Sequence, residues 1–210
     1  LSNPNSATWS PVMGTLAHRW SFNGDLLDPV GGSNATVVEV GANNVSLNPT
    51  NISIAGGTRS IADYVSLGSN LLHGAATPVT IELWATQNAV QNYGRIFDFG
   101  SSTNEFLTMT WSNGTDVNGD TVRWQDPANA SVSNTNAPYT TGTEFHIVLT
   151  IEPGKGTGGG ALVRWWSAPS SSTELGAVQG SFSTANNLVN FVDSLDALGR
   201  SQFGGDGTAS

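Results

Sequence analysis

Short runs in which apolar and polar residues alternate fill most of the chain, and Gly, Asn, Ser or Pro separates one run from the next. Alternation with a period of two is typical of β-strands that bury one face. No window carries a helical period bounded by capping residues, so the chain is predicted to be all-β. The predicted strands cover residues 16–22, 36–40, 64–67, 79–86, 95–99, 106–111, 121–125, 145–151, 161–167 and 197–203, with a strand or short helix over 187–195.

A glycine-rich stretch at residues 153–160 lies between the predicted strands 145–151 and 161–167. Its length and composition predict the tip of a β-hairpin. A phosphate-binding loop would need the order GxxxxGK[ST] followed by a helix, and the stretch has neither.

The length of 210 residues suits one all-β domain, and 25 Gly with 9 Pro fit many strands joined by turns. We expect a polar lead-in over residues 1–13 and a single domain over residues 14–210. No apolar run reaches the roughly 18 residues of a membrane-spanning helix, so membrane insertion is not expected.

Charged residues make up only 11% of the chain, against about 25% in an average globular protein. The net charge is -9 and the seven basic residues are scattered, which argues against nucleic acid as a partner. The absence of Cys excludes disulfides and thiolate metal sites. A polar surface of this kind is common among secreted proteins that meet neutral sugars.

The chain contains, in this order, the segments His18–Asp28, Asp63–Val65, Val79–Trp84, Phe145–Val148, Val163–Trp166 and Leu198–Ser201. Together they resemble the strand motifs of the laminin-G-like family, which has the concanavalin A-like jelly-roll fold. The resemblance implies a two-sheet antiparallel jelly-roll sandwich. It also implies an extracellular, secreted or cell-surface protein that binds carbohydrate or acts in adhesion.

Two departures from the family concern the end of the chain. The hairpin that usually ends in Asp-Gly carries Ser167-Ala168-Pro169, and no closing strand of the form D-E-x-R-I-Y precedes Ser210. In the family that strand lies beside the first one, so we expect a sandwich without its closing C-terminal strand. Two explanations stay open. The segment is cut from a longer protein, or a neighbouring chain donates the strand to an unpaired edge and builds a homo-oligomeric structural subunit.

Motifs for catalysis are absent from the sequence. Glycoside hydrolases on this fold carry paired carboxylates on one strand, such as E-x-D-x-E, and no such string occurs. His18, His73 and His146 show no metal-ligand spacing, and GxSxG is missing. The chain is therefore predicted not to be an enzyme, with a divergent glycan-active enzyme on the same fold as an alternative.

One turn is a candidate calcium site. Asn23, Asp25 and Asp28 place three oxygen ligands close together, and Ca²⁺ prefers carboxylate and amide oxygens. The family resemblance also implies calcium near this end of the sandwich. The alternative is a turn made of residues that simply favour turns.

Sugar binding requires an exposed aromatic ring beside hydrogen-bonding side chains. In the predicted strands, Trp20, Trp84 and Trp165 are expected to point inward. Because neighbours along a strand point to opposite faces, Arg164 and Trp166 are expected to point outward.

The predicted strand 121–125 follows the same rule and directs Arg123 and Gln125 outward. If this strand neighbours 161–167, its outward pair joins Arg164 and Trp166 in one polar and aromatic patch. A Trp166 covered by a loop is the alternative. The sequence therefore predicts a non-catalytic module of a larger secreted protein that binds a glycan or another extracellular protein, with Ca²⁺ as its candidate cofactor.

Overall fold

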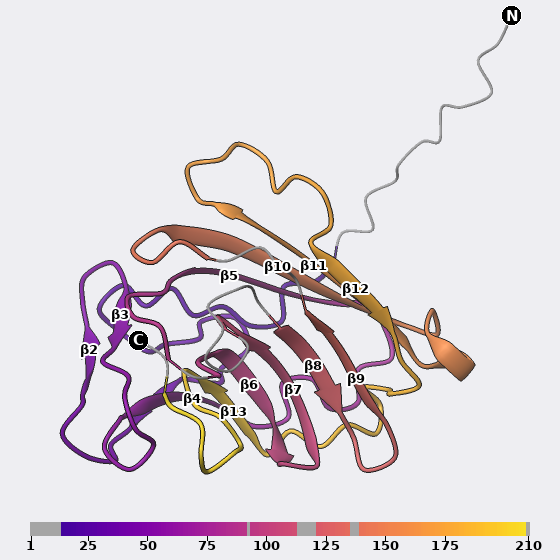
Figure 1. The fold of residues 1–210 in the computed structure, drawn as a ribbon, viewed down its shortest axis with the longest axis horizontal. Helices are drawn as coiled ribbons and strands as arrows, with labels where there is room; N and C mark the ends of the chain where they lie inside the picture. Colours follow the sequence, from indigo (N-terminus) through magenta and orange to yellow (C-terminus); the bar gives the residue numbers. More distant parts are fainter. Residues whose placement is uncertain (1–13, 92, 113–120, 135–138, 209–210) are drawn as a thin grey trace, which may run out of the picture.

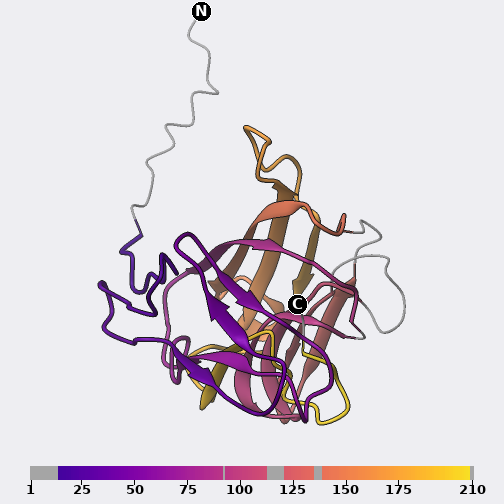
Figure 2. The ribbon, with the colours of Figure 1, turned by 90° about the vertical axis from the view of Figure 1, so that its left-hand side faces the viewer.

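The chain folds as an antiparallel β-sandwich of two main sheets, as the alternation of residues predicted (Figure 1). The computed structural model describes residues 14–91, 93–112, 121–134 and 139–208. In Figure 1 the four-stranded sheet lies above the seven-stranded sheet, and a short two-stranded hairpin lies at one end. Figure 2 shows the loop of residues 170–179 standing clear of both sheets.

The seven-stranded sheet has the order β1 (Thr36–Val38), β4 (Tyr64–Gly68), β13 (Leu195–Leu198), β6 (Arg95–Ser102), β7 (Glu105–Thr110), β8 (Thr121–Gln125) and β9 (Ala130–Asn134). The four-stranded sheet has the order β12 (Gly180–Ser183), β11 (Ala161–Pro169), β10 (Glu144–Pro153) and β5 (Val79–Thr86). The hairpin pairs β2 (Val45–Leu47) with β3 (Ile52–Ile54), and η1 (Thr157–Gly159) is a short 3-10 helix between β10 and β11.

The core lies between the two sheets and follows the alternation of their strands. In β10, Ile147, Leu149 and Ile151 point inward and are buried. Trp165 of β11 is fully buried beside them, as predicted. Gly180 lies opposite Trp165, and a Cβ atom there would come within 2.3 Å of the indole ring. Glycine at this position therefore lets the indole ring of Trp165 fit the core.

A β-bulge in β6 brings two charged residues to the same outer face. The register shifts between Arg95 and Phe97, so Ile96 is an extra residue, and Ile96 and Phe97 both enter the core. Arg95 and Asp98 then lie on the outer face, where Arg95 Nε donates to Asp98 Oδ2 at 3.1 Å. Arg95 also donates to Asp206 Oδ2 at 2.7 Å, which ties the C-terminal segment 199–208 to the sheet.

The C-terminal segment covers part of the outer face of the seven-stranded sheet. The ring of Phe203 packs edge-on against Phe106 of β7, with the ring centroids 5.3 Å apart. The backbone N–H of Gln202 donates to Asp98 Oδ2 at 3.1 Å. Thr208 pairs with Gly57 through backbone hydrogen bonds. Much of this face is consequently closed to solvent.

The prediction of a first strand over residues 16–22 is wrong. Trp20 and Phe22 pack against the core, and Trp20 Nε1 donates to the carbonyl of Ser33 at 2.8 Å, but the segment forms no ladder. A strand needs a hydrogen-bonded neighbour. Among the described residues, no strand pairs with 16–22 or with the edge of β5 that faces away from β10.

Other differences from the predicted elements are smaller. Residues 187–194 form a loop, and only Leu195–Leu198 of the two last predicted segments makes a strand. The short strands β2, β3, β9 and β12 were not predicted, because three to five residues carry too little alternation to be recognised.

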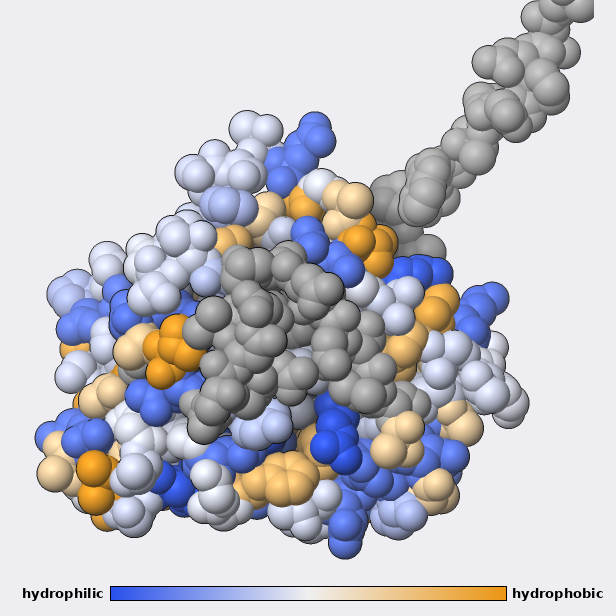
Figure 3. All heavy atoms as spheres, in the orientation of Figure 1, coloured by the Kyte–Doolittle hydropathy of each residue, from blue (hydrophilic) through white to orange (hydrophobic). Residues whose placement is uncertain are grey.

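The surface in view in Figure 3 is predominantly polar, and the apolar side chains of the described residues are scattered over it. No helix in the described part of the chain has the length and apolarity needed to span a lipid bilayer.

Two buried carboxyl groups lie next to each other near the start of β13. Asp193 and Asp196 are both inaccessible to solvent, and the backbone N–H groups of Leu72 and Leu71 donate to them at 2.8 and 3.3 Å. Burial, reinforced by the neighbouring carboxylate of Asp193, raises the pKa of Asp196 to about 8. Burial also raises the pKa of Asp193. Asp196 is therefore protonated in the folded protein at neutral pH.

The raised pKa of Asp196 makes the stability of the fold dependent on pH. In the unfolded chain this carboxyl ionises near pH 4, so its contribution to stability is full below that pH and is lost as the pH rises towards about 8. We expect Asp196→Asn, which stays neutral, to lose less stability than the wild type between about pH 5 and about pH 9. Urea unfolding across this range measures the difference, and parallel curves for the two proteins would contradict the assignment.

Candidate functional site

The outer face of the four-stranded sheet carries the most prominent group of exposed aromatic and charged side chains, and we call it the small-sheet face. Strict alternation along β5 directs Val79, Ile81 and Leu83 towards the core. The residues between them point outward. The small-sheet face is formed by Glu82, Trp84, His146, Glu152, Arg164 and Trp166.

Trp84, on the edge strand β5, is the most exposed aromatic residue of this face: its side chain is 56% exposed, although we predicted it to point inward. The prediction was wrong because it followed the size and apolarity of the residue, whereas alternation places Trp84 on the same side as Glu82. Its ring lies parallel to the imidazole of His146, which is opposite it in β10, with the centroids 4.4 Å apart and 3° between the planes.

A carboxylate fixes the imidazole on which Trp84 stacks. His146 Nε2 lies 2.8 Å from Glu82 Oε1, and since a carboxylate only accepts, Nε2 carries the hydrogen. This hydrogen bond fixes the imidazole, and stacking on the fixed imidazole holds the indole ring in one orientation. A ligand that stacks on Trp84 therefore loses little binding free energy to the ordering of this side chain.

The free side of the Trp84 ring faces away from β10. His146 covers the ring face towards β10, and the other ring face looks over the edge of β5, where no strand pairs with it in the described part of the chain. The exposed aromatic surface and the open sheet edge are thus the same region of the molecule.

Arg164 and Trp166 lie on the same face, on the other side of β10, as predicted from their alternation. Trp166 is opposite Val148 and is half-buried. Arg164 forms an ion pair with Glu152, so its positive charge is matched within the face. Across two strand spacings and two residues, the Cα atoms of Trp84 and Trp166 are separated by about 12 Å.

Arg123 and Gln125 point outward as predicted, but they do not join this face. Their strand β8 belongs to the seven-stranded sheet, so they lie on the opposite side of the sandwich from Trp166. There the guanidinium of Arg123 lies over the ring of Phe106, 5.2 Å from its centroid, and donates to Gln125 Oε1 at 2.8 Å. The predicted single patch of four residues is therefore two separate surfaces.

The candidate calcium turn is organised by its own backbone. Asp28 is buried, and its Oδ1 accepts hydrogen bonds from the N–H groups of Arg19, Val30 and Gly31 at 3.0 to 3.1 Å. Its Oδ2 accepts a hydrogen bond from the N–H of Ser33 at 3.1 Å and lies 2.7 Å from Nδ1 of His18. These donors occupy the lone pairs that a cation would use.

The pKa of Asp28 reflects the same contacts. Burial raises it, but the backbone N–H groups and the hydrogen bond with His18 outweigh burial and hold the pKa well below its usual range. Asp25 is exposed, and its Oδ1 accepts from Leu27 N–H at 3.0 Å in a local turn. Calcium binding by Asn23 and Asp25 stays a prediction, whereas Asp28 already has a structural role as the acceptor that closes the loop.

No protein-family model matches the sequence, and no curated protein sequence matches it significantly. Among solved structures, the chain is similar to domain 4 of AbnA, a GH43 extracellular arabinanase from Geobacillus stearothermophilus, in complex with arabinotriose. The TM-score is 0.61 at 16% identity, over 92% of this chain and 88% of that one. It is also similar to the alginate lyase Aly36B, with a TM-score of 0.44 at 9% identity, over 88% and 81% of the two chains.

At this identity, the likeness to the arabinanase domain shows a common β-sandwich fold. The structure thus adds three residues, Trp84, His146 and Glu82, that were not predicted to form a site. The signal that could have found them is the run Val79–Thr86, in which a Trp shares the parity of Glu82 rather than that of Ile81 and Leu83.

The role of Asp28 leads to a stability prediction. In Asp28→Asn an amide N–H₂ would face N–H donors, so we expect the free energy of unfolding to fall by about 1–3 kcal/mol. Asp25→Asn, at an exposed position with one backbone partner, is the matched control and should cost less than about 0.5 kcal/mol. Urea unfolding measures both. We also expect EDTA to leave the melting temperature unchanged, and a lower one would support a structural cation.

Proposed function

We propose that this chain is a non-catalytic extracellular module that binds glycans on the small-sheet face, as part of a larger secreted protein. The observation that carries this proposal is the exposed ring of Trp84, which stacks on His146, while His146 is itself held by a hydrogen bond to Glu82. A rigid aromatic surface of this kind binds at low cost in side-chain entropy.

Sugars present apolar C–H faces and many hydroxyl groups, and the small-sheet face offers partners for both. Trp84 and Trp166 supply aromatic surface on either side of β10, and Glu82, two residues from Trp84 along β5, supplies an acceptor beside it. The arabinanase domain of similar fold was solved with arabinotriose, which supports carbohydrate as the ligand class.

The positions of the acidic residues favour binding over hydrolysis. Glu82 lies opposite Val148, four residues from Glu152 along β10. Four residues and one strand spacing correspond to about 14 Å between the two backbones. The two carboxyl groups of a glycosidase lie about 5 to 10 Å apart. Glu152 is also ion-paired with Arg164, and Glu82 is hydrogen-bonded to His146, so each carboxylate already has a partner within the face, which supports binding over hydrolysis.

A second candidate function rests on the edge of β5. Its eight residues pair with β10 on one side, and their other side has no strand partner among the described residues. An added strand would pair there and would lie against the free face of Trp84. Such strand donation would make the chain a structural subunit, and it would compete with a glycan for the same surface.

Solution size separates these two functions. A glycan-binding module is expected to be a monomer whose mass does not change with concentration, because its ligand is not another copy of the chain. Light scattering coupled to size-exclusion chromatography over a hundredfold range of concentration measures this. A concentration-dependent oligomer would favour strand donation, and its Trp fluorescence should shift to the blue as Trp84 loses contact with water.

Substitution of Trp84 tests glycan binding directly. We expect Trp84→Ala to weaken binding of arabinotriose, or of the best ligand from a glycan array, by at least about tenfold, which corresponds to about 1.4 kcal/mol. Trp84→Phe should retain part of the affinity, and Trp166→Ala should also weaken binding. Because these side chains are exposed or half-buried, the melting temperature should change little. Isothermal titration calorimetry measures the affinities.

The matched control for this experiment is Gln125→Ala. Gln125 lies outward on the opposite sheet, so its removal should leave the affinity unchanged. Unaltered binding by Trp84→Ala would refute the small-sheet face, and a loss in Gln125→Ala would move the site to the seven-stranded sheet.

A further inference from the structure

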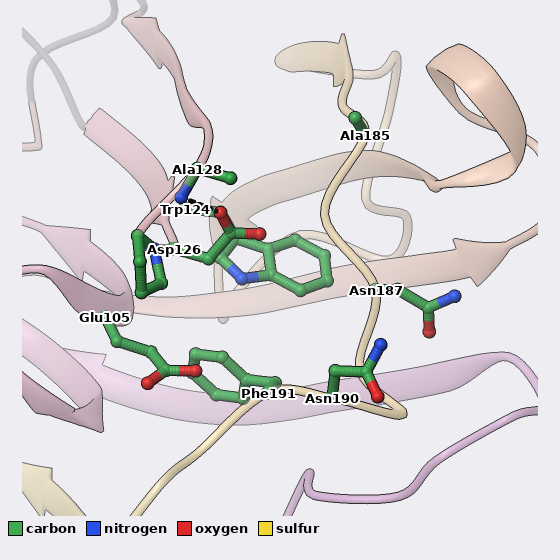
Figure 4. A pocket seen from close by; sticks show the side chains of 9 residues that line it. Glu105, Trp124, Asp126, Ala128, Ala185, Asn187, Asn190 and Phe191 are labelled. Carbon is green, nitrogen blue, oxygen red and sulfur yellow. Dashed lines mark hydrogen bonds between the residues drawn. The ribbon is translucent and has the colours of Figure 1, made fainter.

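A pocket lies at one end of the sandwich, away from the small-sheet face, and we call it the end pocket (Figure 4). It is formed where the turn after β8 approaches the segment that follows β12. Its volume is about 330 Å³, at the lower end of the range for small-molecule sites and suited to one or two sugar units. Its aromatic and polar lining residues are Glu105, Trp124, Asp126, Asn187, Asn190 and Phe191.

The floor of the end pocket is aromatic. Trp124 and Phe191 meet edge to face, with their centroids 5.8 Å apart and 79° between the planes. Trp124 is fully buried, and its Nε1–H has no hydrogen-bond partner among the described residues. In Figure 4 the indole nitrogen lies on the side of the ring towards Glu105. A buried donor without a partner costs about 1–3 kcal/mol, so an acceptor brought by a ligand would recover that energy.

The polar side chains above this floor are held in position by the backbone. Asp126 Oδ1 accepts from the N–H groups of Ala128 and Asn129 at 2.8 and 2.7 Å, which orients Oδ2 as an acceptor for a ligand. Glu105 is fixed by Val192 N–H, at 2.8 Å from its Oε1, and by Ser101 Oγ, at 3.2 Å from its Oε2.

The amide side chains complete the rim of the end pocket. Asn187 Oδ1 accepts from Val189 N–H at 2.9 Å, so its Nδ2 remains as a donor. Asn190 is exposed at the mouth. In Figure 4, Asn187 and Asn190 come from the segment across the pocket from Asp126 and Glu105, and the amide of Asn187 points away from Trp124. The site is therefore built from fixed donors and acceptors over an apolar floor.

The charge of the pocket selects the chemical class of its ligand. Two of the nine lining residues are acidic and none is basic, so a carboxylate or phosphate ligand would be repelled. A simple cation would satisfy the carboxylates but not the unpartnered N–H of Trp124. A hydroxyl group both donates and accepts, and so matches Asp126 and Trp124 together.

We propose that the end pocket is a second glycan site that binds one neutral sugar unit, with hydroxyls bonded to Trp124 Nε1–H and Asp126 Oδ2. The shape is a pocket rather than an open face, so the bound unit is a chain end. The lining of the end pocket comes from β7, β8, the turn after β8 and the segment that follows β12, and none of it belongs to β5, β10 or β11, which form the small-sheet face. The inference shares its ligand class with the proposed function but uses none of the same residues.

Nuclear magnetic resonance of the full chain tests the end pocket, with D-galactose, L-arabinose and D-galacturonate as probes. D-galactose and D-galacturonate differ only at C6, where the second carries a carboxylate. We expect a neutral sugar to shift the indole N–H signal of Trp124, because the ligand settles directly above this buried group. D-galacturonate should bind at least about tenfold more weakly, which corresponds to about 1.4 kcal/mol.

Variants separate this proposal from the one above. Asn190 is exposed, so Asn190→Ala should leave the fold intact, and it should weaken binding of the neutral sugar at least threefold. Asp126→Asn retains the Oδ1 acceptor for the N–H groups of Ala128 and Asn129, and it should reduce the difference in affinity between D-galactose and D-galacturonate. Trp84→Ala should leave the Trp124 signal and its titration unchanged. If Trp84→Ala has no effect on any glycan while the Trp124 signal still shifts, the small-sheet face fails and the end pocket stands.

Three results would overturn the end pocket. The first is a Trp124 signal that no neutral sugar shifts. The second is binding of D-galacturonate as tight as that of D-galactose. The third is a shift that Asn190→Ala leaves at wild-type affinity.

Discussion

The pairing of β10 with strands on both of its sides is the constraint on which the rest of the structure depends. Its inward residues, Ile147, Leu149 and Ile151, are buried and cannot be moved to the outer face without losing the core. That fixed parity also sets which residues of β5 and β11 point outward. For this reason Trp84 is exposed and Trp166 is only half-buried, although both are large apolar side chains that would otherwise be buried.

The two outer faces of the sandwich differ because only one is covered by the chain itself. On the seven-stranded sheet, Arg95 binds Asp98 and Asp206, and Phe203 packs on Phe106, so the C-terminal segment closes much of that face. The outer face of β10 and β5 keeps its aromatic rings in contact with water. The bulge at Ile96 makes this difference possible, because it brings Arg95 and Asp98 to the same side.

Sequence alone predicted the fold class and most long strands, because alternation in runs such as Val79–Thr86 is a local property. It could not predict which sheet a strand joins, and Arg123 and Trp166 therefore appeared to share a patch. Trp84 was misplaced by its apolarity, although its parity with Glu82 was visible. The end pocket could not be predicted from the sequence, since Glu105, Trp124 and the 185–191 segment meet only in the folded chain.

The distribution of charge on the two candidate surfaces favours uncharged glycans. An anionic polysaccharide needs fixed positive charges, and the guanidinium of Arg164 on the small-sheet face is matched by Glu152. The end pocket contains Glu105 and Asp126 and no basic lining residue. With a net charge of -9, the chain adds a general repulsion of polyanions. At the two proposed glycan sites, aromatic stacking and hydroxyl hydrogen bonds, which do not require ligand charge, are then the interactions left to provide both affinity and selectivity.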